Sequence, residues 1–141
     1  MTIKENFMAF AEKQQIPVME LKPEPPAPEH LCIRMQGEQK AFEGHALCME
    51  EEGLFLFYTL LDVRVPKERR ERLLAWLART NYQLKTSAFY MEEATGELTV
   101  RVCQYLTGAD WEKEELIGQL VSICGRTADG YYAELMKLIF A

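Results

Sequence analysis

Hydrophobic residues recur along the chain with two different periods, and their order predicts which segments are helical and which are extended. In residues 1–16 the apolar positions are three and four apart, which is the spacing of an amphipathic helix. From 30 to 36 apolar and polar residues alternate, as expected of a half-buried strand. Turn-forming residues follow, and strand character resumes at 41–49 and again at 54–63.

The segment Pro66–Asn81 combines an apolar stripe with a concentration of positive charge. On a helical wheel Leu73, Leu74 and Leu77 share one face, with Trp76 on its flank. The arginines expected on the opposite side are Arg72 and Arg79. We therefore predict a helix that covers a sheet and turns most of its charges to water, and that ends at its asparagine.

Two further strands and a long terminal helix complete the pattern. The strands are expected at 83–91 and 98–106, as a hairpin around the turn sequence EEATGE. An apolar stripe with three- and four-residue steps then runs to the end of the chain, with Asp110 as its expected N-cap. Gly125 and Gly130 are expected to mark a bend or a break in this helix.

The order of these segments, α-βββ-α-ββ-α, predicts an α+β fold with an antiparallel sheet of about five strands and helices packed on one face. Residues 1–141 are interpreted as a single domain. It consists of a helix at 1–16, a proline-rich linker at 17–29, and the sheet with its helices at 30–141. The strand at 54–63 is apolar on both faces, so we expect both faces to be covered, by the fold or by a partner.

Composition narrows the classes of function. The net charge of −6 and the pI near 5.0 argue against a nucleic-acid binder, which gains affinity by neutralising phosphates. The start of the chain lacks the basic and apolar segments of a signal peptide, and its apolar runs are too short for a membrane span. We therefore expect a cytoplasmic protein that does not enter membranes. The four cysteines are expected to be reduced.

The chemistry-bearing residues form no recognised catalytic motif, so we expect a protein that is not an enzyme and needs no cofactor. Metal binding is the alternative, because His30 with Cys32 and His45 with Cys48 supply imidazoles and thiols. A strand, however, points residues three apart to opposite faces, which separates His45 from Cys48. The alternative function is a small-molecule or metal-binding sensor or enzyme with a pocket near His30, His45 and the cysteines.

Large apolar side chains suggest a protein partner as the leading hypothesis. The candidates for partner contact are residues that the inner face of the sheet does not clearly need: Phe55, Phe57, Trp76 and Phe89. We expect another protein, an extended peptide segment or a second copy of the chain to cover part of this apolar surface.

The stretch from Leu54 to Phe140 resembles the YbjN-like family, whose members are described as bacterial sensory transduction regulators. The likeness is carried by FYTLLDVRVPKERRERLLAWLARTN, SAFYMEEATGELTVRVCQYL and ELIGQLVSICGRTADGYYAELMKLIF. The resemblance implies a fold like that of type III secretion chaperones, with no catalytic residues. Those chaperones work as homodimers and wrap extended client segments, so it also implies a chaperone-like or regulatory role in binding another polypeptide.

Overall fold

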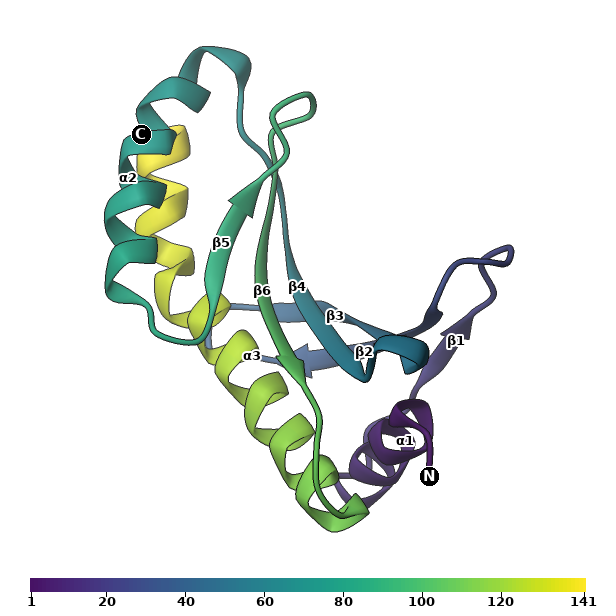
Figure 1. Cartoon of the computed structure of the whole chain (residues 1–141). Coiled ribbons are helices and arrows are strands. Elements are labelled where there is room, and N and C mark those ends of the chain that lie inside the picture. Colours follow the sequence, from purple (N-terminus) through teal and green to yellow (C-terminus); the bar gives the residue numbers. More distant parts are fainter.

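Three helices pack against one antiparallel sheet in the computed structural model, which describes residues 1–141 (Figure 1). The helices are α1 (Ile3–Lys13), α2 (Arg70–Gln83) and α3 (Asp110–Phe140). The strands are β1 (Met19–Leu21), β2 (Glu29–Gln36), β3 (Ala41–Met49), β4 (Leu54–Arg64), β5 (Ala88–Met91) and β6 (Glu97–Tyr105). They pair in the order β1-β2-β3-β4-β6-β5. This confirms the predicted α+β class.

The sixth strand corrects the interpretation of residues 17–29 as a plain linker. Met19–Leu21 forms β1, which pairs with β2 so that Met19 lies opposite Cys32. The prolines at 17 and 23 flank this segment and leave its own N–H groups free to join the ladder. The proline-rich part from 23 to 28 carries no strand.

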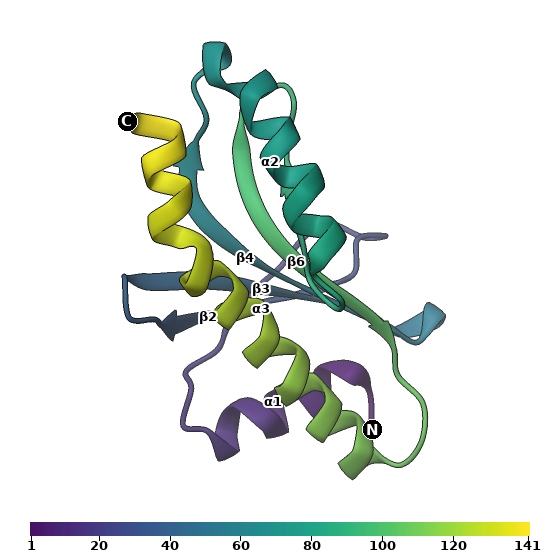
Figure 2. The ribbon, with the colours of Figure 1, turned by 90° about the vertical axis from the view of Figure 1, so that its left-hand side faces the viewer.

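The core lies between the sheet and the helices, on the sheet surface that we call the inner face. Alternate residues of β4 point into it, among them Phe55 and Phe57, both fully buried. The Phe7 ring of α1 packs against both, with ring centroids 6.0 and 6.4 Å away. In α3 the Cys124 thiol lies 3.1 Å from the Thr59 hydroxyl of β4. Figure 2 shows α2 and α3 in front of the sheet.

Helix α1 is held at its start by two caps. Its N-cap Thr2 and the Glu5 side chain exchange hydrogen bonds with each other's backbone N–H groups, as the capping box requires. The Glu50 carboxylate, in the short 3₁₀ helix η1 (Glu50–Glu52), also accepts hydrogen bonds from the N–H groups of Ile3 and Lys4, at 2.8 and 3.0 Å. This negative charge stabilises the positive end of the helix dipole.

Helix α2 covers the sheet as predicted, but with a different buried face. Leu73, Trp76, Leu77 and Thr80 are buried, whereas Leu74 is 54% exposed. The apolar stripe is therefore centred nearer to Trp76 than expected. The segment begins with the 3₁₀ helix η2 (Lys67–Arg69), and α2 continues two residues past the predicted end.

The asparagine expected to end α2 has a structural role of its own. The Asn81 amide donates to the Phe89 carbonyl at 2.9 Å, and its oxygen accepts the Phe89 N–H at 2.7 Å. Because β5 is an edge strand that pairs only with β6, this two-bond contact fixes its free edge to α2.

Helix α3 is continuous over 31 residues, so Gly125 and Gly130 do not break it. Figures 1 and 2 show it changing direction near its middle, where Gly125 lies. A Cβ at Gly125 would lie 3.3 Å from the Met35 sulfur of β2, so this part of α3 packs closely on the sheet. Asp110 is the first helical residue; Ala109 is the N-cap, and its N–H donates to the Glu112 carboxylate. None of the helices has the length and apolar character needed to cross a membrane.

Candidate functional site

The candidate site is the surface of the sheet that faces away from the helices, which we call the outer face. Opposed residues of antiparallel strands project to the same side, so the register defines this surface row by row. One row runs Cys32, His45, Tyr58, Arg101 and Ala88 across five strands. The neighbouring rows contain these residues: His30, Leu47, Leu56 and Cys103; Arg34, Glu43, Leu60, Thr99 and Tyr90; Met49, Leu54 and Tyr105.

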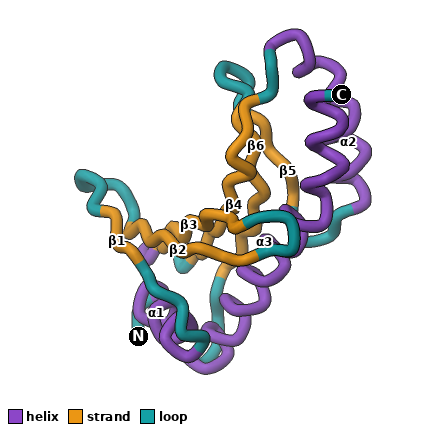
Figure 3. The backbone as a smooth tube through the Cα atoms, turned by 180° about the vertical axis from the view of Figure 1, so that it is seen from behind, coloured by secondary structure: helices purple, strands orange, loops and turns teal.

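No helix of this chain covers the outer face. Contacts from all three helices reach the inner face: Phe7 of α1 meets Phe57, Cys124 of α3 meets Thr59, and Trp76 of α2 meets Phe89. Figure 3, seen from behind, shows the strands β1 to β4 on the near side of α3. The outer face is therefore open to another molecule along the whole width of the sheet.

The centre of the outer face is apolar. Leu47, Leu54, Leu56 and Leu60 are each half-buried. At the β6 end Tyr105 is 65% exposed. Clustered aliphatic side chains with an aromatic rim and no covering element are typical of a protein-interaction surface.

A polar cluster lies at the β2–β3 side of the outer face. His45 stacks on the Tyr58 ring, with centroids 5.0 Å apart and planes 5° from parallel, and it is buried. Its Nδ1 lies 2.7 Å from Nε2 of His30, and its Nε2 lies 2.9 Å from the Glu43 carboxylate. The Cys32 thiol lies 3.4 Å from Glu43 Oε1 and 3.9 Å from His45 Nε2.

Burial shapes the protonation of this cluster. It raises the pKa of the Cys32 thiol to about 11, helped by the hydrogen bond to Glu43, so the thiol is protonated at neutral pH. Burial also lowers the pKa of His30, with a further contribution from His45, and raises the pKa of the Tyr58 hydroxyl. These shifts disfavour a free thiolate nucleophile at Cys32.

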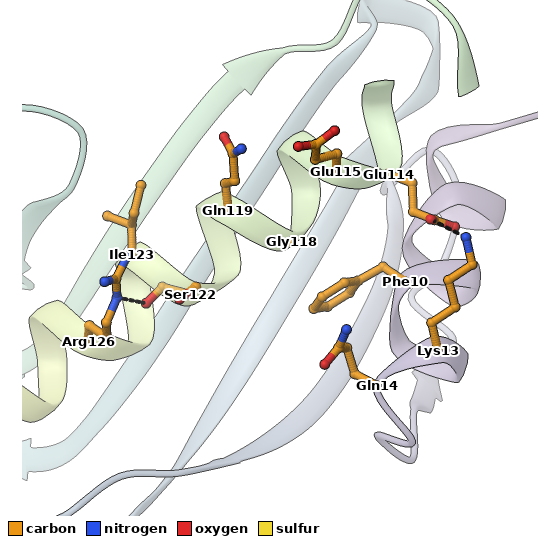
Figure 4. Close-up of a pocket in the computed structure, with 10 residues that line it drawn as sticks. All are labelled: Phe10, Lys13, Gln14, Glu114, Glu115, Gly118, Gln119, Ser122, Ile123 and Arg126. Atoms are coloured by element: carbon orange, nitrogen blue, oxygen red, sulfur yellow. Dashed lines mark hydrogen bonds and ion pairs between the residues drawn. The ribbon is translucent and has the colours of Figure 1, made fainter. Parts of the chain in front are cut away.

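The grooves elsewhere on the molecule are wide open to solvent. The one between α1 and α3, with a volume of about 660 Å³, is drawn in Figure 4. Lys13 pairs there with Glu114 at 2.6 Å, and the Phe10 ring reaches the helix at Gly118. Arg126 lies at its other end and donates to the Ser122 carbonyl of its own helix. Every buried side-chain nitrogen and oxygen atom in the structure has a hydrogen-bond partner.

Comparison with protein families matches residues 34–137 to YbjN, described as "Putative bacterial sensory transduction regulator". The chain belongs to the YbjN family. The match covers the first two blocks on which the resemblance was based and the third as far as Lys137, and it extends back to Arg34 in β2. No protein with a curated description matches the sequence.

Two solved structures share the fold of this YbjN-family chain. An uncharacterised protein from Methanothermobacter thermautotrophicus superposes with a TM-score of 0.64 at 12% identity, over 99% of both chains. A chain of the ExsC-ExsE complex superposes with a TM-score of 0.54 at 15% identity, over 94% of both chains. At these identities the likeness establishes the fold, and it confirms the predicted type III secretion chaperone-like arrangement.

The four residues expected to contact a partner lie in the core of this YbjN-family chain. Phe55 and Phe57 are fully buried, Phe89 is 2% exposed and Trp76 is 8% exposed. The Trp76 ring meets the Phe89 ring edge-on at 5.3 Å, and its Nε1 donates to Glu134 at 2.7 Å. The expectation that the inner face does not need these side chains is wrong, because they fill the space between sheet and helices.

The apolar residues of β4 that another molecule could reach are instead the alternate ones on the outer face, Leu54, Leu56 and Leu60. Sequence reasoning recognised two apolar faces on this strand but did not identify which one the helices cover. The signal that could have decided it lies in β6. Val100 and Val102 pair with Thr59 and Phe57, so the apolar set of β6 marks the inner face.

Proposed function

We propose that this protein is a non-enzymatic, cytosolic binding protein that holds a segment of another protein against its outer face, in a regulatory or chaperone-like role. The observation that carries the proposal is the uncovered row of half-buried leucines at the centre of a six-stranded sheet. Membership of a family described as sensory transduction regulators supports the regulatory role. The similar fold of a chain from a two-protein complex supports a polypeptide partner.

The chemistry of the surface favours a polypeptide over a small solute. The leucines extend over the surface of β3 and β4, where Leu47 lies opposite Leu56, and such an extended apolar surface suits a polypeptide better than a small solute, whose sites are concave cavities. Arg101, whose guanidinium lies 4.6 Å from the centre of the Tyr90 ring, adds a charge beside it. An apolar centre with tyrosine and arginine at its margin is the composition of protein-binding surfaces.

The test is site-specific photo-crosslinking in the cells that make the protein. A photoreactive phenylalanine analogue at Leu56 would report contacts at the outer face. The same analogue at Leu74, on the solvent side of α2 and 54% exposed, serves as the matched control. We expect one defined heteromeric adduct from position 56, absent from position 74, with the crosslinked partner peptide identified by mass spectrometry.

Two results would contradict the proposal. The first is the absence of any adduct from position 56 when the analogue is incorporated and the protein is folded, which would mean that the outer face meets only water. An adduct with the mass of two copies of the chain would assign the surface to self-association instead of a separate partner.

A further inference from the structure

The polar cluster on the outer face places three different metal-ligating groups around one point. Cys32 and His45 are directly opposed on β2 and β3, and Glu43 lies two residues before His45 on the same side of β3. The Cys32 sulfur, a Glu43 oxygen and a His45 nitrogen all lie within 4.8 Å of one another. The register of a single hairpin therefore assembles the set, with no contribution from a mobile loop.

The separations suit a small tetrahedral ion. With zinc bonds of about 2.3 Å to sulfur and about 2.0 Å to nitrogen and oxygen, tetrahedral ligands lie roughly 3.3 to 3.6 Å apart. The observed separations are 2.9 Å between His45 and Glu43, 3.4 Å between Cys32 and Glu43, and 3.9 Å between Cys32 and His45. Shifts of a few tenths of an ångström in the exposed Glu43 and half-buried Cys32 side chains, with His45 held in place, would bring all three to bonding distance.

The histidine is oriented as a metal ligand requires. Stacking on Tyr58 fixes the plane of the His45 ring, and its Nδ1 is 2.7 Å from Nε2 of His30. When Nδ1 of His45 carries the proton and donates it to His30, the lone pair of Nε2 points at Glu43 and Cys32. A second residue that fixes the tautomer of a ligating histidine in this way is a regular feature of metal sites.

We propose that Cys32, Glu43 and His45 bind one Zn²⁺ ion on the outer face, with His30 as the residue that positions His45. One thiolate, one imidazole and one carboxylate favour zinc over magnesium or calcium, which prefer oxygen ligands alone. Three protein ligands leave the fourth tetrahedral position open, and the 55% exposure of the Glu43 side chain gives access from solvent. This site does not depend on the proposed partner, because all three ligands come from one chain.

The same residues also form a hydrogen-bonded arrangement without a metal, and it differs chemically from the zinc-bound arrangement. Without a metal, a proton on Nε2 of His45 joins the ring to Glu43, and the Cys32 thiol donates to the same carboxylate. On zinc binding the thiol proton is released to solvent, and the His45 proton is exchanged from Nε2 to Nδ1, so that the ring stays neutral and donates to His30 while Nε2 bonds to the metal. The two arrangements differ in whether the sulfur is a thiolate.

The experiment uses the tag-free, reduced, full-length protein after treatment with a chelator. Zn²⁺ is titrated in competition with a chromophoric chelator to give stoichiometry and affinity. Co²⁺ is then used as a spectroscopic substitute, because a bound thiolate gives an intense sulfur-to-cobalt absorption. We expect one ion per chain, with this absorption present in the wild type and in Cys103→Ser. Cys103 is the matched control, a more exposed thiol on the same face in β6.

The variants separate a built site from adventitious binding. Cys32→Ser should abolish the cobalt–sulfur absorption and weaken zinc binding at least 100-fold, and His45→Gln should do the same. His30→Gln should keep the absorption but weaken zinc about 10- to 100-fold, the usual effect of removing an orienting residue. Circular dichroism establishes that each variant is folded. Absence of stoichiometric zinc, or an absorption that survives Cys32→Ser and disappears in Cys103→Ser, would overturn the proposal.

Discussion

Adjacent residues of β4 should differ sharply in what they contribute to stability, because they point to opposite faces of the sheet. Phe57 is fully buried, packed against the Phe7 ring and paired across the sheet with Val102. Truncation to alanine leaves a cavity in the core and should lower the free energy of unfolding by about 3 to 5 kcal/mol. Leu56, on the outer face, is only half-buried, so its truncation should cost about 1 kcal/mol or less.

The assay is urea unfolding of Phe57→Ala and Leu56→Ala, followed by circular dichroism. With a slope of roughly 2 kcal/mol per molar urea, the first variant should lose about 2 M in midpoint and the second about 0.5 M or less. The same slope for both variants and the wild type is needed for the comparison. Equal losses, or a greater loss for Leu56→Ala, would refute the assignment of the two faces.

Three further predictions test other contacts. Gly44→Ala should lower the free energy of unfolding by about 1 to 3 kcal/mol, measured by urea unfolding, because the added Cβ would collide with the Phe57 ring. Glu50→Ala should lower the free energy of unfolding by about 0.5 to 2 kcal/mol, because the Ile3 N–H loses its acceptor. It should also increase amide hydrogen exchange in the first turn of α1, and unchanged exchange there would contradict the capping role. Timed alkylation with peptide mass mapping should label Cys103 before Cys48, because burial raises the pKa of the Cys48 thiol to about 12 and blocks access of the reagent to it. Faster labelling at Cys48 would be inconsistent with the packed core.

The order of the main elements was predictable because each carries its own local signal. Alternation at 30–36 and the three- and four-residue steps in the last helix are properties of short windows, and both elements form where expected. The strand β1 was not predictable, since three residues between prolines are extended only because the edge of β2 is available. The set of α2 residues that is buried was not predictable either. The large Trp76 ring lies in the interface with the sheet, and Leu74 is left exposed.

The candidate sites depend on tertiary information to different degrees. That His45 and Cys48 point to opposite faces follows from strand geometry, and the structure confirms it: Cys48 is opposite the inner-face Phe55. That Cys32 lies opposite His45 depends on the register of the β2–β3 hairpin. Asp129 of α3 fixes the connecting turn by accepting hydrogen bonds from the N–H groups of residues 38 and 39, a contact no local pattern reveals.

The most direct test of the central claim is the affinity of the crosslinked partner segment for two matched variants. Leu56→Glu puts a charge into the centre of the outer face, and Leu74→Glu puts the same charge on the exposed side of α2. We expect isothermal titration calorimetry to show at least a 50-fold loss of affinity for Leu56→Glu and less than a twofold change for Leu74→Glu, with both variants folded. Equal affinities would contradict the assignment of the outer face as the binding surface.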